Sequence, residues 1–196
     1  MKRALEVAGA NVSLTNDPNK ILTGSHVVLP GVGAYSSAMK LLKELGYIEA
    51  LNTLVRNNVP LLGICLGMQL FFDESEEFNV CKGLGYISGK VISLQRINSQ
   101  FVEKIPHNGW AELKENDIGI SWNKSIFKDI KANDSVYFTH SYVGDTAQKK
   151  DILAYCKFGN SFITAAVQKQ NIIGCQFHPE KSGEVGLKIL ERFISL

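Results

Sequence analysis

A cysteine stands between two glycines in the segment LLGICLGMQLFF, residues 61–72. The apolar run 59–65 predicts a buried strand, and a helix is expected to begin directly after Cys65. A strand that turns sharply into a helix exposes the residue at the turn, and the helix N-terminus stabilises a thiolate. Gly63 and Gly67 leave room for close backbone approach. Cys65 is therefore a candidate nucleophile; the alternative is a buried cysteine beside glycines required for packing.

A cysteine nucleophile needs a base, and that base needs a group that orients it. His178 lies in the segment QFHPEKS, between an expected strand and the last expected helix. Because Pro179 keeps the chain extended, Glu180 can lie on the same side as His178. Glu180 can then bind one imidazole nitrogen while the other faces Cys65, which is the division of roles in a catalytic triad.

The remaining histidines and cysteines stand in less specific settings. His107 and His140 lie near expected strand ends and stay possible as bases, whereas His26 is expected to be structural. The other cysteines are expected to be small buried apolar residues: Cys81, Cys156 and Cys175. None of the four forms a CxxC pair, so neither a zinc site nor another cofactor is expected.

The segment LPGVGAY, residues 29–35, suits an oxyanion site. An expected strand ends at Pro30, and two glycines precede a helix, so backbone N–H groups are presented at the end of the strand. A tetrahedral acyl intermediate needs such donors, and the N–H groups of Gly33 and Leu66 are candidates. A phosphate-binding turn or ordinary loop glycines remain alternatives.

The length, net charge and hydropathy of the chain favour a single cytoplasmic domain. The chain has 196 residues, which suits one domain, 1–196, with a substantial core. The net charge of +2 does not indicate a nucleic-acid partner. No apolar run is long enough to cross a membrane, and the N-terminal ten residues do not resemble a signal peptide.

The order of expected elements predicts a three-layer α/β/α fold with a mixed sheet. The first half combines helices at 1–10, 34–57 and 66–72, with a break near Gly46, and strands at 11–14, 25–30 and 59–65. The second half combines strands at 85–94, 101–106, 135–143, 151–158, 161–168 and 171–177 with a helix at 182–195. Apolar spacing predicts that the 34–57 helix buries Ala38, Leu41, Leu42, Leu45 and Ile48.

Five segments, in this order, resemble class I glutamine amidotransferases of the triad type. They are LPGVGAY (29–35), PLLGICLGMQL (60–70), IPHNGW (105–110), YFTHSYV (137–143) and GCQFHPEKS (174–182). Among these, PHNGW and GICLGMQL resemble more narrowly the glutaminase subunits of imidazole glycerol phosphate synthases. The resemblance implies a glutaminase in which Cys65 is the nucleophile, His178 the base and Glu180 the residue that orients it.

The resemblance also assigns roles to other positions. Gly31 and Gly33 match the oxyanion loop. The positions that hold the substrate L-glutamine match Gln69, Glu77, Ser141 and Tyr142. The positions near a partner subunit match Asn108, Trp110 and Lys181. Non-functional alternatives remain for three of these positions: Trp110 as a core aromatic residue, Lys181 as a solvated charge, and Glu77 as one of several acidic residues in DESEEF.

The implied chemistry is acyl transfer that releases ammonia. By resemblance, the ammonia passes to a (β/α)8-barrel cyclase that makes imidazole glycerol phosphate for histidine biosynthesis, so the expected assembly is a heterodimer. Glutaminase activity is expected to stay low until the partner binds its own ligand. Three alternatives remain: a paralogue that supplies another synthase, such as one that modifies surface sugars; a cysteine peptidase or γ-glutamyl hydrolase; and a truncated, inactive binding subunit.

The chain departs from the family at its beginning. Family members usually begin with a strand and a Tyr-Gly-x-Gly-Asn loop, whereas Met1 opens inside the expected first helix. We therefore expect the fold to lack the family's first strand. Either the sequence is truncated, or the true start lies upstream, or something else covers the gap. Unpaired backbone groups at the sheet would then lower stability.

Overall fold

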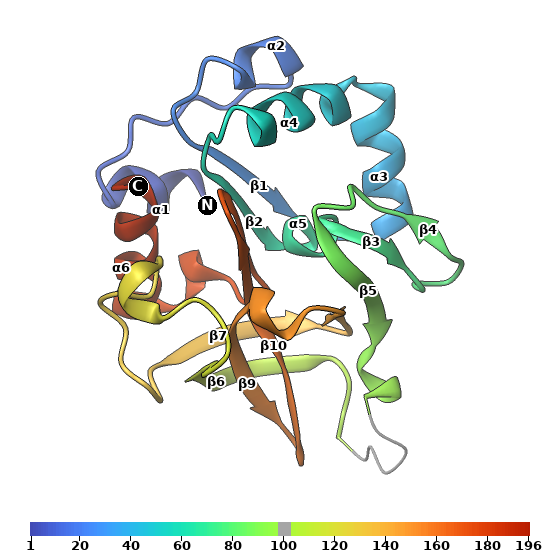
Figure 1. Cartoon of the computed structure of the whole chain (residues 1–196), viewed down its shortest axis with the longest axis vertical. Helices are drawn as coiled ribbons and strands as arrows, with labels where there is room; N and C mark the ends of the chain where they lie inside the picture. Colours follow the sequence, from blue (N-terminus) through green and yellow to red (C-terminus); the bar gives the residue numbers. More distant parts are fainter. Residues whose placement is uncertain (98–102) are drawn as a thin grey trace.

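The computed structural model describes residues 1–97 and 103–196, which form two sheets and the helices packed on them (Figure 1). The helices are α1 (Lys2–Val7), α2 (Pro18–Ile21), α3 (Tyr35–Glu44), α4 (Tyr47–Arg56), α5 (Leu66–Gln69) and α6 (Gly183–Ile194). Short 3-10 helices are η1 (Leu94–Arg96), η2 (Trp122–Lys124), η3 (Lys149–Asp151) and η4 (Pro179–Lys181). The first strands are β1 (Val27–Gly31), β2 (Leu61–Cys65), β3 (Phe72–Ser75), β4 (Cys81–Lys82), β5 (Ile87–Ser93) and β6 (His107–Glu115). The others are β7 (Ser135–His140), β8 (Tyr142–Thr146), β9 (Ile152–Phe158), β10 (Ser161–Lys169) and β11 (Ile172–Cys175).

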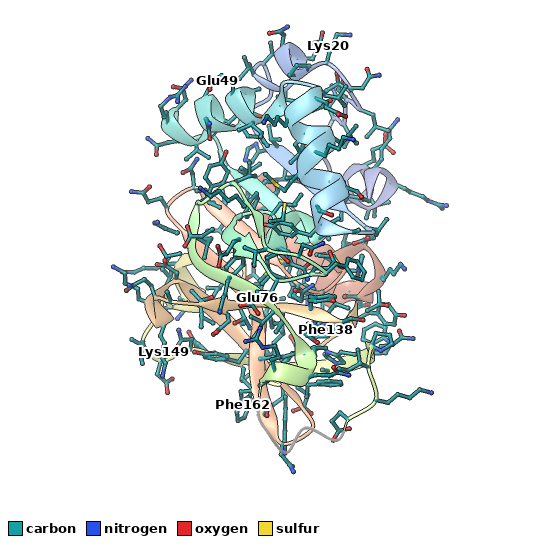
Figure 2. The ribbon with its side chains drawn as sticks, turned by 90° about the vertical axis from the view of Figure 1, so that its right-hand side faces the viewer. Lys20, Glu49, Glu76, Phe138, Lys149 and Phe162 are labelled. Carbon is teal, nitrogen blue, oxygen red and sulfur yellow. The ribbon has the colours of Figure 1, made fainter. Side chains whose placement is uncertain are left out.

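The larger sheet has seven strands in the order β1-β2-β11-β10-β9-β6-β7. β1, β2 and β11 pair in parallel, and the remaining neighbours pair antiparallel. The smaller sheet has the order β4-β3-β5-β8. This mixed arrangement confirms the expected α/β fold. Figure 2 shows the helical end, with Lys20 and Glu49, opposite the strand-rich end with Phe162.

Every residue of β2 is buried, because both faces of the sheet are covered at this strand. Leu62 and Ile64 pack in the apolar cluster that contains Phe193 of α6. Leu61 packs in the other cluster, which contains Leu51 of α4. Side chains alternate across a strand, so a continuous apolar run is what a strand between two helical layers requires.

The helices at 34–57 follow the expected break, but their buried face differs from the prediction. Gly46 adopts φ +72°, in the left-handed region that glycine favours, and separates α3 from α4. The prediction for Leu41 and Leu45 was wrong, because their exposed fractions are 55% and 43%. The prediction for Leu42 is confirmed, since α3 buries Leu42 together with Tyr35 and Met39. Ala38 and Ile48 are partly buried against the same core.

Several other expectations about elements were wrong. Residues 11–14 form no strand, and the helix expected at 66–72 ends at Gln69. β6 was not expected as a strand, and Cys81 is only half-buried. The strand expected at 101–106 is absent from 103–106, and 101–102 lie outside the described residues. In the described ranges, no helix is long and apolar enough to cross a membrane.

Replacing Gly67 by alanine should destabilise the fold by about 3 kcal/mol or more. A Cβ atom at this position would collide with the backbone carbonyl oxygen of Leu29 in β1. Chemical denaturation measures the change in the free energy of unfolding. Gly24→Ala is the control, because its nearest atom would lie 3.2 Å away, and it should cost clearly less. Equal losses for the two variants would contradict this account of the turn.

Candidate active site

The carboxyl ends of three parallel strands meet at one edge of the larger sheet. Gly31, the last residue of β1, pairs with Cys65, the last residue of β2. On the other side of β2, Cys175 at the end of β11 pairs with Ile64. The segments that follow these strands therefore lie side by side, which is where open α/β sheets place their ligands. His178 belongs to one of these segments, three residues beyond β11.

Cys65 occupies a sharp turn between β2 and α5. Its backbone adopts φ +53° and ψ −109°, a conformation that residues with side chains rarely adopt. The expectation that the turn exposes Cys65 was wrong, because the residue is buried, with an exposed fraction of 8%. A Cβ atom on Gly63 would lie 2.7 Å from the backbone of Gly67, and one on Gly31 would lie 3.1 Å from the side chain of Leu66. The three glycines thus allow the close packing around Cys65 that the sequence predicts.

The backbone of His178 is held against β7 by two residues that the sequence did not single out. The His178 N–H donates to the carbonyl oxygen of Tyr137 at 2.9 Å. The Ser182 hydroxyl donates to the His178 carbonyl oxygen at 2.7 Å and accepts from the Tyr137 N–H at 3.0 Å. Ser182 directly precedes α6, and its place at a helix start is the sequence signal that could have indicated it, although its side chain does not cap the helix.

The imidazole of His178 has different surroundings at its two nitrogens. Nδ1 lies 3.0 Å from Glu180 Oε1, so Nδ1–H donates to the carboxylate. Nε2 is buried, and no described residue offers it a hydrogen bond of ordinary geometry. The nearby Cys65 thiol is the main cause that raises the pKa of His178 to about 9, and Glu180 raises it further, while burial opposes both.

The Glu180 carboxylate is held ionised beside this ring. Burial by itself would raise its pKa, but the hydrogen bond from His178 and the positive charge nearby lower it overall. A carboxylate on one imidazole nitrogen fixes the tautomer and orients the other nitrogen. His178 and Glu180 are thus brought together, with the free nitrogen of the ring on the side of Cys65. The expectation that Pro179 keeps this segment extended was wrong, because Pro179–Lys181 form the 3-10 helix η4.

Two buried glutamines complete the surroundings of the thiol. Gln176 Nε2 lies 3.8 Å from Cys65 Sγ, and the thiol lies 4.0 Å from the carbonyl oxygen of Thr139. Gln69 Nε2 donates to Gln176 Oε1 at 3.0 Å and to the carbonyl oxygen of Tyr142 at 2.9 Å. The sequence did not single out Gln176.

The residues expected at the oxyanion and substrate positions surround the same edge. Leu66 is the first residue of α5. Because the first N–H groups of a helix have no acceptor within it, the Leu66 N–H has no partner in α5. Gly33 lies in the exposed loop after β1 with φ +101°. Glu77 Oε2 accepts the N–H of Tyr35 at 2.6 Å and so lies at the start of α3. Ser141 separates β7 from β8, directly before Tyr142.

The two histidines left open as bases form a buried pair of their own. His107 Nδ1 lies 3.1 Å from His140 Nε2, and His140 Nδ1 lies 2.8 Å from the carbonyl oxygen of Tyr142. Because a carbonyl only accepts, His140 donates from Nδ1 and receives the His107 hydrogen at Nε2. Burial lowers the pKa of His107 to about 4 and that of His140 to about 3. Both rings are therefore neutral near pH 7, and His178 is the histidine that faces Cys65.

Three residues expected at a partner interface gather around Tyr137. The Tyr137 hydroxyl donates to Asn108 Oδ1 at 2.8 Å. The Trp110 ring meets the Tyr137 ring edge-on at 6.1 Å, and Lys181 Nζ lies 5.6 Å from the ring centroid. Trp110 is 58% exposed, so it is not a core aromatic. We call these four residues the Tyr137 patch.

The site has no feature of a metal centre. Within residues 1–97 and 103–196, no group of three His, Cys, Asp or Glu side chains could hold a metal ion. The arrangement is that of a thiol, an imidazole and a carboxylate, the groups used in nucleophilic acyl transfer.

Comparison with known families agrees with this chemistry. Residues 2–196 match the family model described as glutamine amidotransferase class-I. The chain therefore belongs to the class-I glutamine amidotransferase family.

Within this family, the chain is similar to HisH subunits of imidazole glycerol phosphate synthase. Subunit HisH 1 of Legionella pneumophila (strain Lens) is 42% identical over 196 residues, which cover 99% of this chain and 92% of that protein. HisH of Carboxydothermus hydrogenoformans is 46% identical, over 96% of this chain and 89% of that protein. HisH of Archaeoglobus fulgidus is 43% identical, over 100% of this chain and 91% of that protein.

Solved structures share the fold at lower identity. A crystal structure of a glutamine amidotransferase superposes with a TM-score of 0.71 at 18% identity, over 98% of this chain and 91% of that one. The glutaminase domain of Trypanosoma brucei CTPS with bound acivicin gives a TM-score of 0.66 at 17% identity, over 99% of this chain and 86% of that one.

The titration of His178 should depend on the Cys65 thiol. We expect an NMR titration midpoint of about 9 for the His178 ring, and a clearly lower midpoint in Cys65→Ala, because the thiol is the main cause of the shift. A pKa raised above the ordinary value of 6.5 means that the charged ring stabilises the fold below about pH 6.5, and that this contribution is lost as the pH rises through about 9. Cys81→Ala, a thiol in β4, is the control and should leave the midpoint unchanged. An unaltered midpoint in Cys65→Ala would contradict the assignment.

Proposed function

We propose that the chain hydrolyses L-glutamine to glutamate and ammonia through a thioester on Cys65. The observation that carries this proposal is the placement of His178, with one nitrogen on Glu180 and the other free beside the thiol. Membership of the class-I glutamine amidotransferase family supports this proposal, because the family's name denotes transfer of the glutamine amide group.

The reaction begins with an ion pair of the Cys65 thiolate and the His178 imidazolium. The thiolate attacks the side-chain carbonyl carbon of glutamine, and the oxygen that becomes negative is bound by the N–H of Leu66 and by the Gly31–Gly33 loop. As the C–N bond breaks, His178 donates its proton, and ammonia leaves.

The second half of the reaction returns the enzyme to its starting state. Neutral His178 takes a proton from water, and the resulting hydroxide attacks the thioester carbonyl. The C–S bond then breaks, which releases glutamate and restores the thiolate beside the charged ring. Glu180 stays ionised throughout and stabilises the imidazolium.

Four residues are proposed to hold the amino-acid part of the substrate: Gln69, Glu77, Ser141 and Tyr142. They come from α5, from the segment after β3, and from the junction between β7 and β8. Glu77 carries a negative charge suited to the substrate ammonium group. Its hydrogen bond to the Tyr35 N–H fixes its position relative to the loop after β1.

The ammonia is proposed to pass to a (β/α)8-barrel cyclase in a heterodimer that makes imidazole glycerol phosphate in histidine biosynthesis. The names of the curated relatives support this step, since each is a subunit of imidazole glycerol phosphate synthase. The Tyr137 patch suits such an interface, because an exposed tryptophan, a tyrosine and a lysine lie together beside His178. A single unit spanning 1–196 and a cytoplasmic location complete the proposal.

The outer edge of β1 is a further part of the proposal. β1 is the terminal strand of the larger sheet and pairs with β2. We propose that the first strand expected of the family would pair along this edge and satisfy its backbone N–H and C=O groups.

Cys65→Ala should abolish glutaminase activity, because no other described thiol faces His178. Wild type should release glutamate slowly alone and much faster with a cyclase subunit that has bound its own ligand. Coupled measurement of glutamate separates these cases. Full activity of the isolated chain would refute the partner dependence, and activity in Cys65→Ala would refute the nucleophile.

Trp110→Ala should weaken binding of the cyclase by about tenfold or more, because exposed tryptophans commonly dominate interface energy. Phe162→Ala is a matched control: Phe162, labelled in Figure 2, is also 58% exposed but lies on β10, outside the Tyr137 patch. Calorimetric titration of each variant with the cyclase measures the change in Kd. Equal effects, or no effect of Trp110→Ala, would place the interface elsewhere.

A further inference from the structure

Gln176 is a fully buried polar side chain between the end of β11 and His178. Its backbone N–H donates to the carbonyl oxygen of Ala165 on β10 at 2.9 Å, which fixes the start of the side chain. Its side-chain amide lies between Gln69 and Cys65. The catalytic steps given above do not use this residue.

The direction of the Gln176 amide follows from its neighbours. The Tyr142 carbonyl oxygen can only accept, so the Gln69 NH2 group must face it. The second hydrogen of the same NH2 group then points to Gln176, which must present its oxygen. The Gln176 NH2 group is thereby left facing Cys65 Sγ, 3.8 Å away.

We propose that Gln176 is a positioning residue for the nucleophile, donating a hydrogen bond from its side-chain amide to the Cys65 thiolate. Gln69 sets the direction of this donor by binding both Tyr142 and Gln176. The inference rests on the proposed function, because the thiolate matters only if Cys65 attacks a substrate.

A buried thiolate requires such a donor. Removing a charge from water is costly unless hydrogen bonds compensate, and bonds to a charged group are stronger than those between neutral groups. In the described ranges, His178 is the titratable side chain shown to interact with the thiol, and in the proposed reaction its positive charge accompanies the thiolate before attack and after the thioester is cleaved. Gln176 cannot lose a proton, so its donor remains during the whole reaction. It would also hold Sγ in one direction for attack.

The test uses the full chain with its cyclase and compares wild type with Gln176→Met, which keeps the length of the side chain but removes the donor. Iodoacetamide labels the thiolate, and peptide mass spectrometry follows labelling at Cys65 across a pH series. The midpoint of labelling should rise by about one pH unit in Gln176→Met. The kcat for glutamine should fall about tenfold at pH 7, with a smaller change in KM.

Gln168→Met is the matched control, because it makes the same chemical change on β10, at a residue that pairs with Ile173 and not with Cys175 at the end of β11. It should keep the wild-type labelling midpoint and kcat. A purely packing role for Gln176 would lower the melting temperature of Gln176→Met but leave the midpoint unchanged, and that result would overturn the inference.

A second measurement needs no variant at Gln176. In wild type, the NMR resonance of the Gln176 side-chain amide should move with the same pH midpoint as Cys65 labelling, and this movement should vanish in Cys65→Ala. A resonance that stays constant across the labelling midpoint would overturn the inference even if Gln176→Met fails to fold. If wild type and cyclase together release no glutamate while the resonance follows labelling, the proposed function fails and the hydrogen bond stands.

Discussion

The backbone at Cys65 is the constraint on which the site depends. A non-glycine residue at φ +53° and ψ −109° costs about 1–3 kcal/mol, and the surrounding packing must hold it there. Packing can do so because Gly31, Gly63 and Gly67 let two strands and α5 approach more closely than side chains would allow. This backbone conformation places the buried thiol beside Gln176 and His178, in the segment after β11.

Buried polar groups next to the turn surround the two residues that carry charge in the proposed reaction, Cys65 and His178. Glu180 holds one side of His178, and Ser182 holds its backbone against β7. Behind the thiol, Gln69 and Gln176 connect α5 to the segment after β11. Such a set of buried donors and acceptors is stabilising only when most of its members are paired. The turn and the charged groups thus depend on the same close approach of strands.

The sequence predicted those parts of the site that depend on neighbours along the chain. The apolar run 59–65, the turn at Cys65 and the short spacing from His178 to Glu180 all appear in the structure. A break at Gly46 was also visible, because glycine there adopts a conformation that other residues avoid. These features are local, so residue type and spacing are enough to indicate them.

Other parts depend on contacts that no spacing reveals. β6 begins with HNGW, which resembles turn chemistry, and its residues alternate between exposed and partly buried positions, so its apolar signal is weak. The apolar segment 66–72 fits either a helix or a strand, and the chain enters β3 at Phe72. Gln176 meets Gln69 across 107 positions of sequence, so only the folded chain brings them together.

Trapping the acyl intermediate tests the central claim most directly. Wild type mixed with glutamine and cyclase, quenched in acid within one turnover and digested, should yield a peptide in which Cys65 carries one glutamyl group. The modification should be absent when glutamate replaces glutamine. Turnover of glutamine without any adduct on Cys65, or with the adduct on Cys81, Cys156 or Cys175, would contradict the account.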